Sequence, residues 1–333
     1  VKVKAVNDKP VAVNDSAETD EDTVVTIDVT ANDTDVDGTI DVTSVDLDPA
    51  TAGIQTTFSV TGQGTYSVDN SGIVTFTPAA NYNGTTTPIN YTVNDNQGAV
   101  SASATITVKV KGVNDKPVAV NDNAETDEDT VVTIDVTAND TDVDGTIDVA
   151  SVDLDPATAG IQTTFSVTGQ GTYSVDALGI VTFTPAANYN GTTTPINYTV
   201  HDNQGAVSAS ATITVKVKAI NDKPVAVNDS AETDEDTVVT IDVTANDTDV
   251  DGTIDVTSVD LDPATAGIQT SFSVTGQGTY SVDNSGIVTF TPAANYNGTT
   301  TPISYTVQDN QGAVSASATI TVKVKAVNDK PVA

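Results

Sequence analysis

The feature that most constrains this chain is an internal repeat of 107 residues. The motif Asn-Asp-Lys-Pro starts at Asn7 and again at Asn114, Asn221 and Asn328, so each copy begins 107 residues after the previous one. Aligning the three full copies leaves only nine positions that differ. A unit of about 100 residues has the size of a domain and can bury its own core, unlike a short solenoid repeat. The sequence therefore predicts a row of three similar domains.

The repeat register sets the expected domain boundaries. We expect one domain in residues 5–111, a second in 112–218 and a third in 219–325, with 1–4 and 326–333 belonging to partial flanking repeats. The last 12 residues repeat the first 12, and the chain begins with Val rather than Met. We therefore expect this sequence to be a section of a longer array.

Each repeat has the residue pattern of β-strands. Val or Ile alternates with Thr or Asp in Thr23–Thr30 and in Thr39–Leu47, as expected for strands with one buried face. No stretch has the i, i+3, i+4, i+7 apolar spacing of an amphipathic helix. Further strands are expected near Pro10–Asn14, as an edge strand, and at Ile54–Val60, Thr65–Asp69, Ile73–Thr77, Ile89–Val93 and Ala99–Lys109. Ile54–Val60 is either an extra strand or the first half of a kinked long one.

Seven or eight short strands in about 100 residues, joined by turns rich in Gly, Asn and Asp, are typical of a β-sandwich. The predicted fold class is all-β, with tandem sandwiches arranged end to end as a rod of roughly 120 Å or more. The apolar residues expected in the core of the first repeat are Val25, Ile27, Val29, Ile40, Val42, Val45, Phe58, Tyr66, Val74, Phe76, Tyr82, Tyr91, Val93, Ile106 and Val108.

The composition excludes several classes of function. Asp and Glu number 46 against 12 Lys, with no Arg, so the formal net charge is −34. Binding nucleic acid requires clustered basic residues, and an acidic surface disfavours anionic lipid. No apolar run approaches the roughly 18 residues of a membrane span. Without Cys there are neither disulfides nor thiolate metal sites. We therefore expect no nucleic-acid partner and no membrane insertion by this segment.

Many acids are grouped in loops rather than scattered. The segment Asp33–Gly38 reads Asp-x-Asp-x-Asp-Gly and recurs in all three repeats. Three carboxylates at alternate loop positions can converge on a hard cation, although the twelfth position is Ser44 rather than Glu, so this is not a helical calcium loop. A second group, Asp20 to Asp22, places three acids in a row, which repel unless a cation or hydrogen bonds offset them. For both groups the alternative is a solvated polar turn without metal.

The topology of an end-to-end array brings these loops together at the linkers. In such an array the Asn-Asp linker between two repeats is faced by the loop after the first strand of one repeat and by two loops of the next. All twelve Lys residues also lie near these boundaries. We therefore expect Ca²⁺ at each joint as the cofactor. The candidate ligands are Asp20, Glu21, Asp22, Asp33, Asp35, Asp37 and Asp95 in the first repeat, Asn114, Asp115, Asp127, Glu128, Asp129, Asp140, Asp142, Asp144 and Asp202 in the second, and Asn221, Asp222, Asp234, Glu235, Asp236, Asp247, Asp249, Asp251 and Asp309 in the third.

These residues also carry a family resemblance. The segments that carry it are Pro10–Asp15, Glu21-Asp22-Thr23, Ala31–Gly38, Phe76–Pro78, Tyr82–Gly84, Tyr91–Val93 and Asp95–Gly98. Each repeat resembles the cadherin-like, immunoglobulin-like tandem repeats of giant bacterial adhesins, and most closely the extender region of RTX adhesins. The resemblance implies a secreted rod at the bacterial cell surface, stiffened by calcium between domains, that holds adhesion domains away from the cell. It implies a monomeric rod whose partners are the neighbouring repeats.

Two other functions are alternatives to the extender. A repeat could itself bind a glycan, a protein or a surface, but Thr85–Thr87 is the only candidate array for such a face. An enzyme is not expected, because the only His, His201, is replaced by Asn94 and Gln308 in the other copies and no general-base partner accompanies the Ser and Asp residues.

Overall fold

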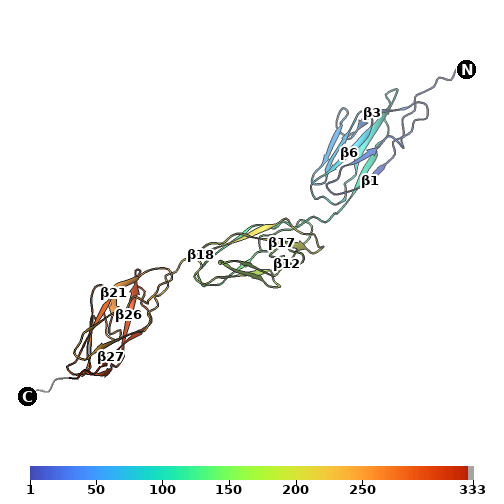
Figure 1. Cartoon of the computed structure of the whole chain (residues 1–333). Helices are drawn as coiled ribbons and strands as arrows, with labels where there is room; N and C mark the ends of the chain where they lie inside the picture. The colour runs from blue at the N-terminus through green and yellow to red at the C-terminus, as the bar shows by residue number, and fades with distance from the viewer. Residues whose placement is uncertain (329–333) are drawn as a thin grey trace, which may run out of the picture.

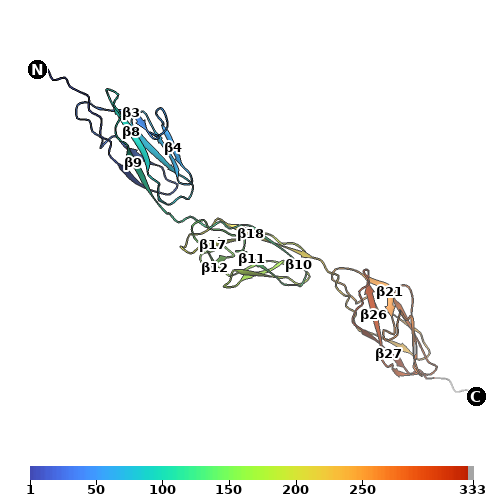
Figure 2. The same ribbon diagram turned by 180° about the vertical axis from the view of Figure 1, so that it is seen from behind.

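The computed structural model describes residues 1–328 as three β-sandwiches in a row. They lie end to end in an elongated, slightly kinked rod, with the N- and C-termini at opposite ends (Figure 1), and the view from behind shows the same order (Figure 2). This confirms the predicted all-β fold class. Residues 329–333, which belong to the expected flanking repeat 326–333, lie outside the described residues. Within residues 1–328 no helix could span a membrane.

Each repeat has nine strands. Those of the first repeat are β1 (Asp15–Asp20), β2 (Val25–Asp28), β3 (Ile40–Asp46), β4 (Thr57–Val60), β5 (Gly64–Val68), β6 (Ile73–Pro78), β7 (Gly84–Thr85), β8 (Ile89–Asp95) and β9 (Ala104–Lys111). Those of the second are β10 (Asp122–Asp127), β11 (Val132–Asp135), β12 (Ile147–Asp153), β13 (Thr164–Val167), β14 (Gly171–Val175), β15 (Ile180–Pro185), β16 (Gly191–Thr192), β17 (Ile196–Asp202) and β18 (Ala211–Lys218). Those of the third are β19 (Asp229–Asp234), β20 (Val239–Asp242), β21 (Ile254–Asp260), β22 (Ser271–Val274), β23 (Gly278–Val282), β24 (Ile287–Pro292), β25 (Gly298–Thr299), β26 (Ile303–Asp309) and β27 (Ala318–Lys325).

Two sheets pack face to face in every repeat. In the first repeat one sheet has the order β1-β9-β8-β3, with β7 also paired to β9, and the other has the order β2-β6-β5-β4. All pairs are antiparallel except β1 with β9, which run in parallel. The first and last strands of each repeat are therefore neighbours in one sheet.

The core between the sheets consists of inward-facing β-branched and aromatic residues. Tyr66 and Phe76 are fully buried, with ring centroids 4.6 Å apart. Most of the predicted core is buried as expected, whereas Val25, Ile40, Phe58 and Tyr82 are only partly buried and pack against it, and Val42 stays outside it. The sequence analysis missed four core members: Leu47, Ile89, Ala104 and Val110.

Two strand predictions need correction. The edge strand expected near Pro10–Asn14 lies further on, at β1, and Val11 forms only an isolated bridge to Thr34. β1 is too polar for its alternation to be visible in the sequence, and it exists because β9 offers it a parallel partner. The uncertain segment Ile54–Val60 is resolved: only Thr57–Val60 forms a strand, which is a separate edge strand paired with β5.

Candidate metal centre at the joints between repeats

On the side of the first repeat, Glu21, which directly follows β1, contacts the linker between the first two repeats. The Glu21 N–H donates to the Lys111 carbonyl at 2.8 Å, which places the side chain beside the outgoing chain. One carboxylate oxygen, Oε1, accepts the N–H of Val113 in the linker. The Glu21 side chain is thus pinned between the end of its own repeat and the linker, and the residue is only 6% exposed.

On the side of the second repeat, two acids accept hydrogen bonds from the same linker. The Asn114 amide Nδ2 donates to Asp202 Oδ2 at 2.6 Å, and the Asp115 N–H donates to Asp144 Oδ1 at 3.3 Å. Asp202 ends β17 and is 2% exposed, while Asp144 belongs to the Asp-x-Asp-x-Asp-Gly loop. Acids of two successive repeats therefore contact one short linker, and the second joint shows the same contacts around Asn221 and Asp222.

The loop that carries Asp142 and Asp144 is tightly folded. Asp142 Oδ1 accepts the N–H groups of Asp144, at 3.1 Å, and of Gly145, at 2.9 Å. A Cβ atom at Gly145 would lie 2.6 Å from Asn203 Oδ1, a distance at which one of the two groups would have to move. Glycine is therefore needed here so that the loop can close against Asn203, and the second oxygen of Asp142 remains free of hydrogen bonds.

Several buried oxygens at each joint have no hydrogen-bond partner. At the first joint these are Glu21 Oε2, Asn114 Oδ1, Asp115 Oδ2 and Asp142 Oδ2, and at the second they are Asn221 Oδ1, Asp222 Oδ2 and Asp249 Oδ2. A buried polar atom without a partner costs about 1–3 kcal/mol, and more when it is charged. The two joints have seven such oxygens, which a hydrogen-bond donor or a cation could satisfy.

The electrostatics of the joint show that acids from both sides act on the linker. Desolvation, followed by repulsion from Asp251, Glu128, Asp129 and Asp249, raises the pKa of Asp222. Glu128 and Asp129 belong to the second repeat and the other two acids to the third. Without a counter-ion, the linker carboxylate is therefore repelled from both repeats at once.

The acid at the end of β17 is held in its charged form. Burial acts to raise the pKa of Asp202, but hydrogen bonds from the Asn114 amide and from the N–H groups of Ala206, Gln204 and Gly205 outweigh it, so the pKa is lowered. Asp95 and Asp309 are held in the same way in the other repeats. Asp202 therefore favours its charged form, and both of its oxygens accept hydrogen bonds from the protein.

The free oxygens fit calcium better than other metals. They come from carboxylates and Asn amides, whereas zinc and copper favour the His and Cys ligands that the joints lack. Calcium binds 6–8 oxygens in a flexible geometry. In residues 1–328 no three His, Cys, Asp or Glu side chains are already grouped as a metal site, so the acids and the Asn residue of a joint would have to move closer together to bind one ion.

The structure places the first acid of the loop away from the joint. Asp33 Oδ1 accepts the N–H of Val13 at 2.8 Å and the hydroxyl of Tyr91 at 3.1 Å, inside the repeat. Asp140 and Asp247 make the same contacts in the other repeats. These three candidate ligands are thus engaged by internal donors.

The acids beside Glu21 also differ in their surroundings. Asp20 is the last residue of β1 and is exposed. Asp127 and Asp234 are the last residues of β10 and β19 and are exposed as well. Asp22 has a left-handed backbone, with φ of 54°, and its Oδ1 accepts the N–H of Asn81 at 3.1 Å. Asp129 and Asp236 repeat this contact with the equivalent Asn. Only Glu21, Glu128 and Glu235 of this group bind the linker backbone.

The sequence analysis overlooked two residues that the structure places with the candidate ligands. At the N-terminal end of the first repeat, Asn7 Nδ2 donates to Asp95 Oδ2 at 2.6 Å, and the Asp8 N–H donates to Asp37 Oδ1 at 3.2 Å. Asn7 Oδ1 and Asp35 Oδ2 are buried there without a partner. The repeat register could have identified this pair, because Asn7 and Asp8 are the equivalents of Asn114 and Asp115.

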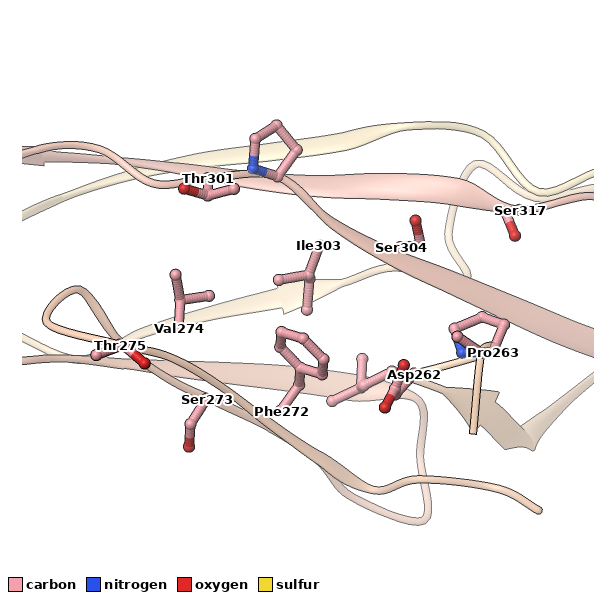
Figure 3. A pocket seen from close by; sticks show the side chains of 13 residues that line it. Asp262, Pro263, Phe272, Ser273, Val274, Thr275, Thr301, Ile303, Ser304 and Ser317 are labelled. Carbon is pink, nitrogen blue, oxygen red and sulfur yellow. The ribbon is translucent and has the colours of Figure 1, made fainter. Parts of the chain in front are cut away.

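Each repeat also has a groove on its flank, away from the joints. In the third repeat it has a volume of about 570 Å³, and Phe272, Val274 and Ile303 point into it (Figure 3). The equivalent grooves have volumes of about 620 Å³ in the second repeat and about 350 Å³ in the first. Their lining mixes Leu, Phe, Val and Ile with Ser, Thr, Pro and one Asp, and no cluster of ionisable groups faces them.

Comparison with known proteins agrees with this architecture. Residues 7–109 and 221–323 match the bacterial Ig domain family, and residues 114–219 match the bacterial cadherin-like domain family. The chain belongs to the bacterial Ig domain family. Tandem Ig-like and cadherin-like domains of this kind are typically non-catalytic and are typical of extracellular and surface proteins.

The chain is also similar to solved structures of cadherins. Mouse cadherin-23 EC22-24 is 17% identical with a TM-score of 0.51, and the match covers 97% of this chain and all of that one. Drosophila N-cadherin EC1-4 is 18% identical with a TM-score of 0.36, covering 97% of this chain and 77% of that one. At these identities the likeness shows the fold alone. No curated protein matches the chain.

Proposed function

We propose that this chain is an extender segment of a bacterial surface adhesin of the RTX type. In this proposal its tandem Ig-like domains hold distal adhesion domains away from the cell, and Ca²⁺ at the joints keeps the rod straight. The supporting observation is the set of buried, unpartnered oxygens at the joints, which come from both repeats and the linker at the first joint and from the linker and the third repeat at the second. Cadherin-like domains often bind Ca²⁺, and the near-identity of the copies suits a spacer, whose length matters more than the character of each unit.

The residues that would hold the ion at the first joint come from three segments. Glu21 would contribute from the first repeat, Asn114 and Asp115 from the linker, and Asp142 and Asp144 from the second repeat. When bound, Ca²⁺ supplies positive charge and coordination for oxygens that otherwise repel each other. Because Glu21 also holds the Val113 N–H and Asp144 holds the Asp115 N–H, fixing these carboxylates fixes the linker backbone and removes the freedom to bend there.

Calorimetric titration of the full chain with Ca²⁺ tests this assignment. We expect Asp115→Asn, which changes a linker acid, to lower the affinity or the number of ions bound. The matched control is Asp176→Asn, which makes the same change of charge at an exposed turn of the same repeat. Equal titration curves for the two variants would contradict the proposed ligand set.

Ca²⁺ at the joints should also stabilise the fold. A ligand that binds only the native state at 100 times its Kd stabilises it by about 2.7 kcal/mol per site. We therefore expect a higher melting temperature in Ca²⁺ than in chelator. Mg²⁺ at the same concentration should give a smaller rise, because it requires a stricter octahedral geometry.

The flank grooves support a second candidate function, in which each repeat binds a small ligand. A volume of about 600 Å³ lined by apolar side chains and several hydroxyl groups is within the range of ligand pockets. If this function holds, a glycan or small-molecule screen should yield a ligand whose stoichiometry falls by one site in Phe165→Ala and is unchanged in Asp115→Asn.

A further inference from the structure

The flank groove of each repeat lies beside a strand whose outer edge has no partner within residues 1–328. In the second repeat this strand is β13, which ends the sheet order β11-β15-β14-β13. Phe165 and Val167 of β13 line the groove together with Ile196 of β17. We propose that β13 accepts an extended peptide with alternating apolar and basic side chains as an added strand. The inference rests on the second candidate function, for which it names the partner, and not on Ca²⁺ at the joints.

The free edge of β13 presents main-chain hydrogen-bonding groups. The Val175 N–H donates to the Thr163 carbonyl at 2.9 Å, so these two residues form a hydrogen-bonded pair of the ladder. Such pairs alternate along an antiparallel ladder. Phe165 therefore also bonds to β14, whereas the N–H and C=O groups of Thr164 and Ser166 point away from it. The Ser166 hydroxyl lies 3.0 Å from that of its cross-strand partner, as expected in a non-hydrogen-bonded pair, where side chains are closer.

β13 also lacks the features that usually prevent an edge strand from pairing with another chain. The two sheet orders of the second repeat end in β10, β12, β11 and β13. The first three carry Asp or Glu, and the pairing of β12 has a register shift, whereas β13 reads Thr-Phe-Ser-Val without a charge or a proline. Charges, prolines and bulges are common protections of edge strands. β13 is therefore open to an extended partner, and so are the equivalent strands β4 and β22.

The groove determines which side chains an added strand would place against the repeat. β12 pairs with β17 only at its second half, so residues 196–198 of β17 have no partner on that side within the described part of the chain. The groove of about 620 Å³ lies there, between β13 and the start of β17, as the view of the equivalent groove in the third repeat shows (Figure 3). Because side chains alternate along a strand, every second one would enter this groove, where Phe165, Val167 and Ile196 favour an apolar group.

The remaining side chains of the partner would face acids. The groove is lined by Asp155 and by no Lys. Asp176, which follows the cross-strand partner of Thr163, places a second exposed carboxylate near the start of β13. The whole chain has a net charge of −34. Basic side chains are therefore attracted, whereas an acidic peptide or a second copy of this chain is repelled.

Calorimetric titration of the full chain in chelator tests the added strand, with a synthetic seven-residue peptide of alternating lysine and valine as the probe. Combining Ser59→Pro, Ser166→Pro and Ser273→Pro should weaken binding at least about tenfold. Proline removes the outward N–H of each edge strand and is tolerated there, because that N–H is not part of the ladder. The matched control combines alanine at the same three positions, which keeps the N–H and should bind as the unaltered chain does. Equal binding by the proline and alanine variants would overturn the proposal.

Two further peptides separate strand addition from simple attraction to an acidic rod. A peptide with proline in place of each valine keeps the positive charge but cannot pair as a strand. A peptide with glutamate in place of each lysine keeps the alternation but reverses the charge. Neither should bind. Binding of the proline peptide as tight as that of the valine peptide would show electrostatic adsorption only and would contradict the added strand.

Hydrogen exchange of the unaltered chain decides the matter if the proline variants do not fold. The valine peptide should slow the exchange of the Thr164 and Ser166 amides, and unchanged rates would overturn the proposal. Repeating the titration in Ca²⁺ separates this inference from the extender, because binding at the flank should persist in both solutions. A small ligand inside the groove should still bind Ser166→Pro, so a failure of strand addition is distinguishable from a failure of the second candidate function.

Discussion

The carboxylates of the acidic loop between β11 and β12 lie in two different environments, the interior of the repeat and the joint with the preceding repeat. Asp140 turns into the repeat, where its Oδ1 accepts hydrogen bonds from the Val120 N–H at 2.8 Å and the Tyr198 hydroxyl at 3.1 Å. Asp142 and Asp144 face the linker, and Asp142 keeps one buried oxygen without any partner. Identical residues only two positions apart therefore differ in whether the protein itself satisfies them.

The difference shows what distinguishes a structural acid from a candidate ligand. Around Tyr198 the acids share their space with donors: the tyrosine hydroxyl, a backbone N–H and the Asn139 amide. At the joint most neighbours of the linker acid are other acids. Hydrogen bonds from the repeat itself therefore fix the internal acids, although burial raises the pKa of Asp122 and Asp140, whereas the linker acid faces mostly other acceptors.

The comparison predicts that alanine at the two kinds of acid has different consequences. Asp140→Ala removes charge-assisted hydrogen bonds inside the second repeat and should cost about 1.5–3 kcal/mol of unfolding free energy, with or without Ca²⁺. Asp144→Ala should change stability little in chelator and should reduce the stabilisation that Ca²⁺ provides. Denaturant unfolding in both solutions measures this. If Asp140→Ala cost stability only in Ca²⁺, the distinction between the two acids would be wrong.

A smaller effect is expected from the donor of the internal cluster. Tyr198→Phe removes the hydroxyl that faces Asp122, Asp140 and two backbone carbonyls, and should cost about 1–2 kcal/mol. The control is Tyr189→Phe, since Tyr189 is only partly buried against the same core. Thermal unfolding of the two variants should differ; similar melting temperatures would show that the cluster contributes little.

The smallest predicted effect is a dependence of stability on pH. Burial, with added repulsion from Asp140, raises the pKa of Asp122 to about 6, although the Tyr198 hydroxyl opposes the rise. Because the native pKa lies above the ordinary value of 3.8, this group favours the folded state most at low pH, and its contribution is lost as the pH rises through about 6. In chelator the melting temperature should therefore fall as the pH rises from about 4 to about 6.

Neutral side chains should flatten this pH profile. Asp122→Asn, combined with Asp15→Asn and Asp229→Asn at the equivalent positions, removes three of the groups whose pKa is raised by burial. Some slope should remain, because burial also raises the pKa of Asp33, Asp140 and Asp247, and the pKa of Asp144 at the joint is raised too. A triple variant with the slope of the unaltered chain would contradict the assignment.

The repeat length and the alternation of apolar residues were sufficient to predict the row of sandwiches, because both are local properties of the sequence. β1 was misplaced, since its residues are polar and its strand depends on a parallel partner some 90 residues later. The division of the acidic loop could not be predicted either, because the spacing of Asp33, Asp35 and Asp37 is regular and only the position of Tyr91 separates the first from the others. That position is set by the packing of β8, which no local pattern contains.

Small-angle X-ray scattering of the full chain tests most directly whether cations at the joints set the shape of the rod. In Ca²⁺ we expect an extended particle with a maximum dimension of roughly 120 Å or more. In chelator the repelling acids should let the joints bend, so the radius of gyration should fall and the profile should become that of a flexible chain of three domains. Superimposable profiles in the two solutions would contradict the account.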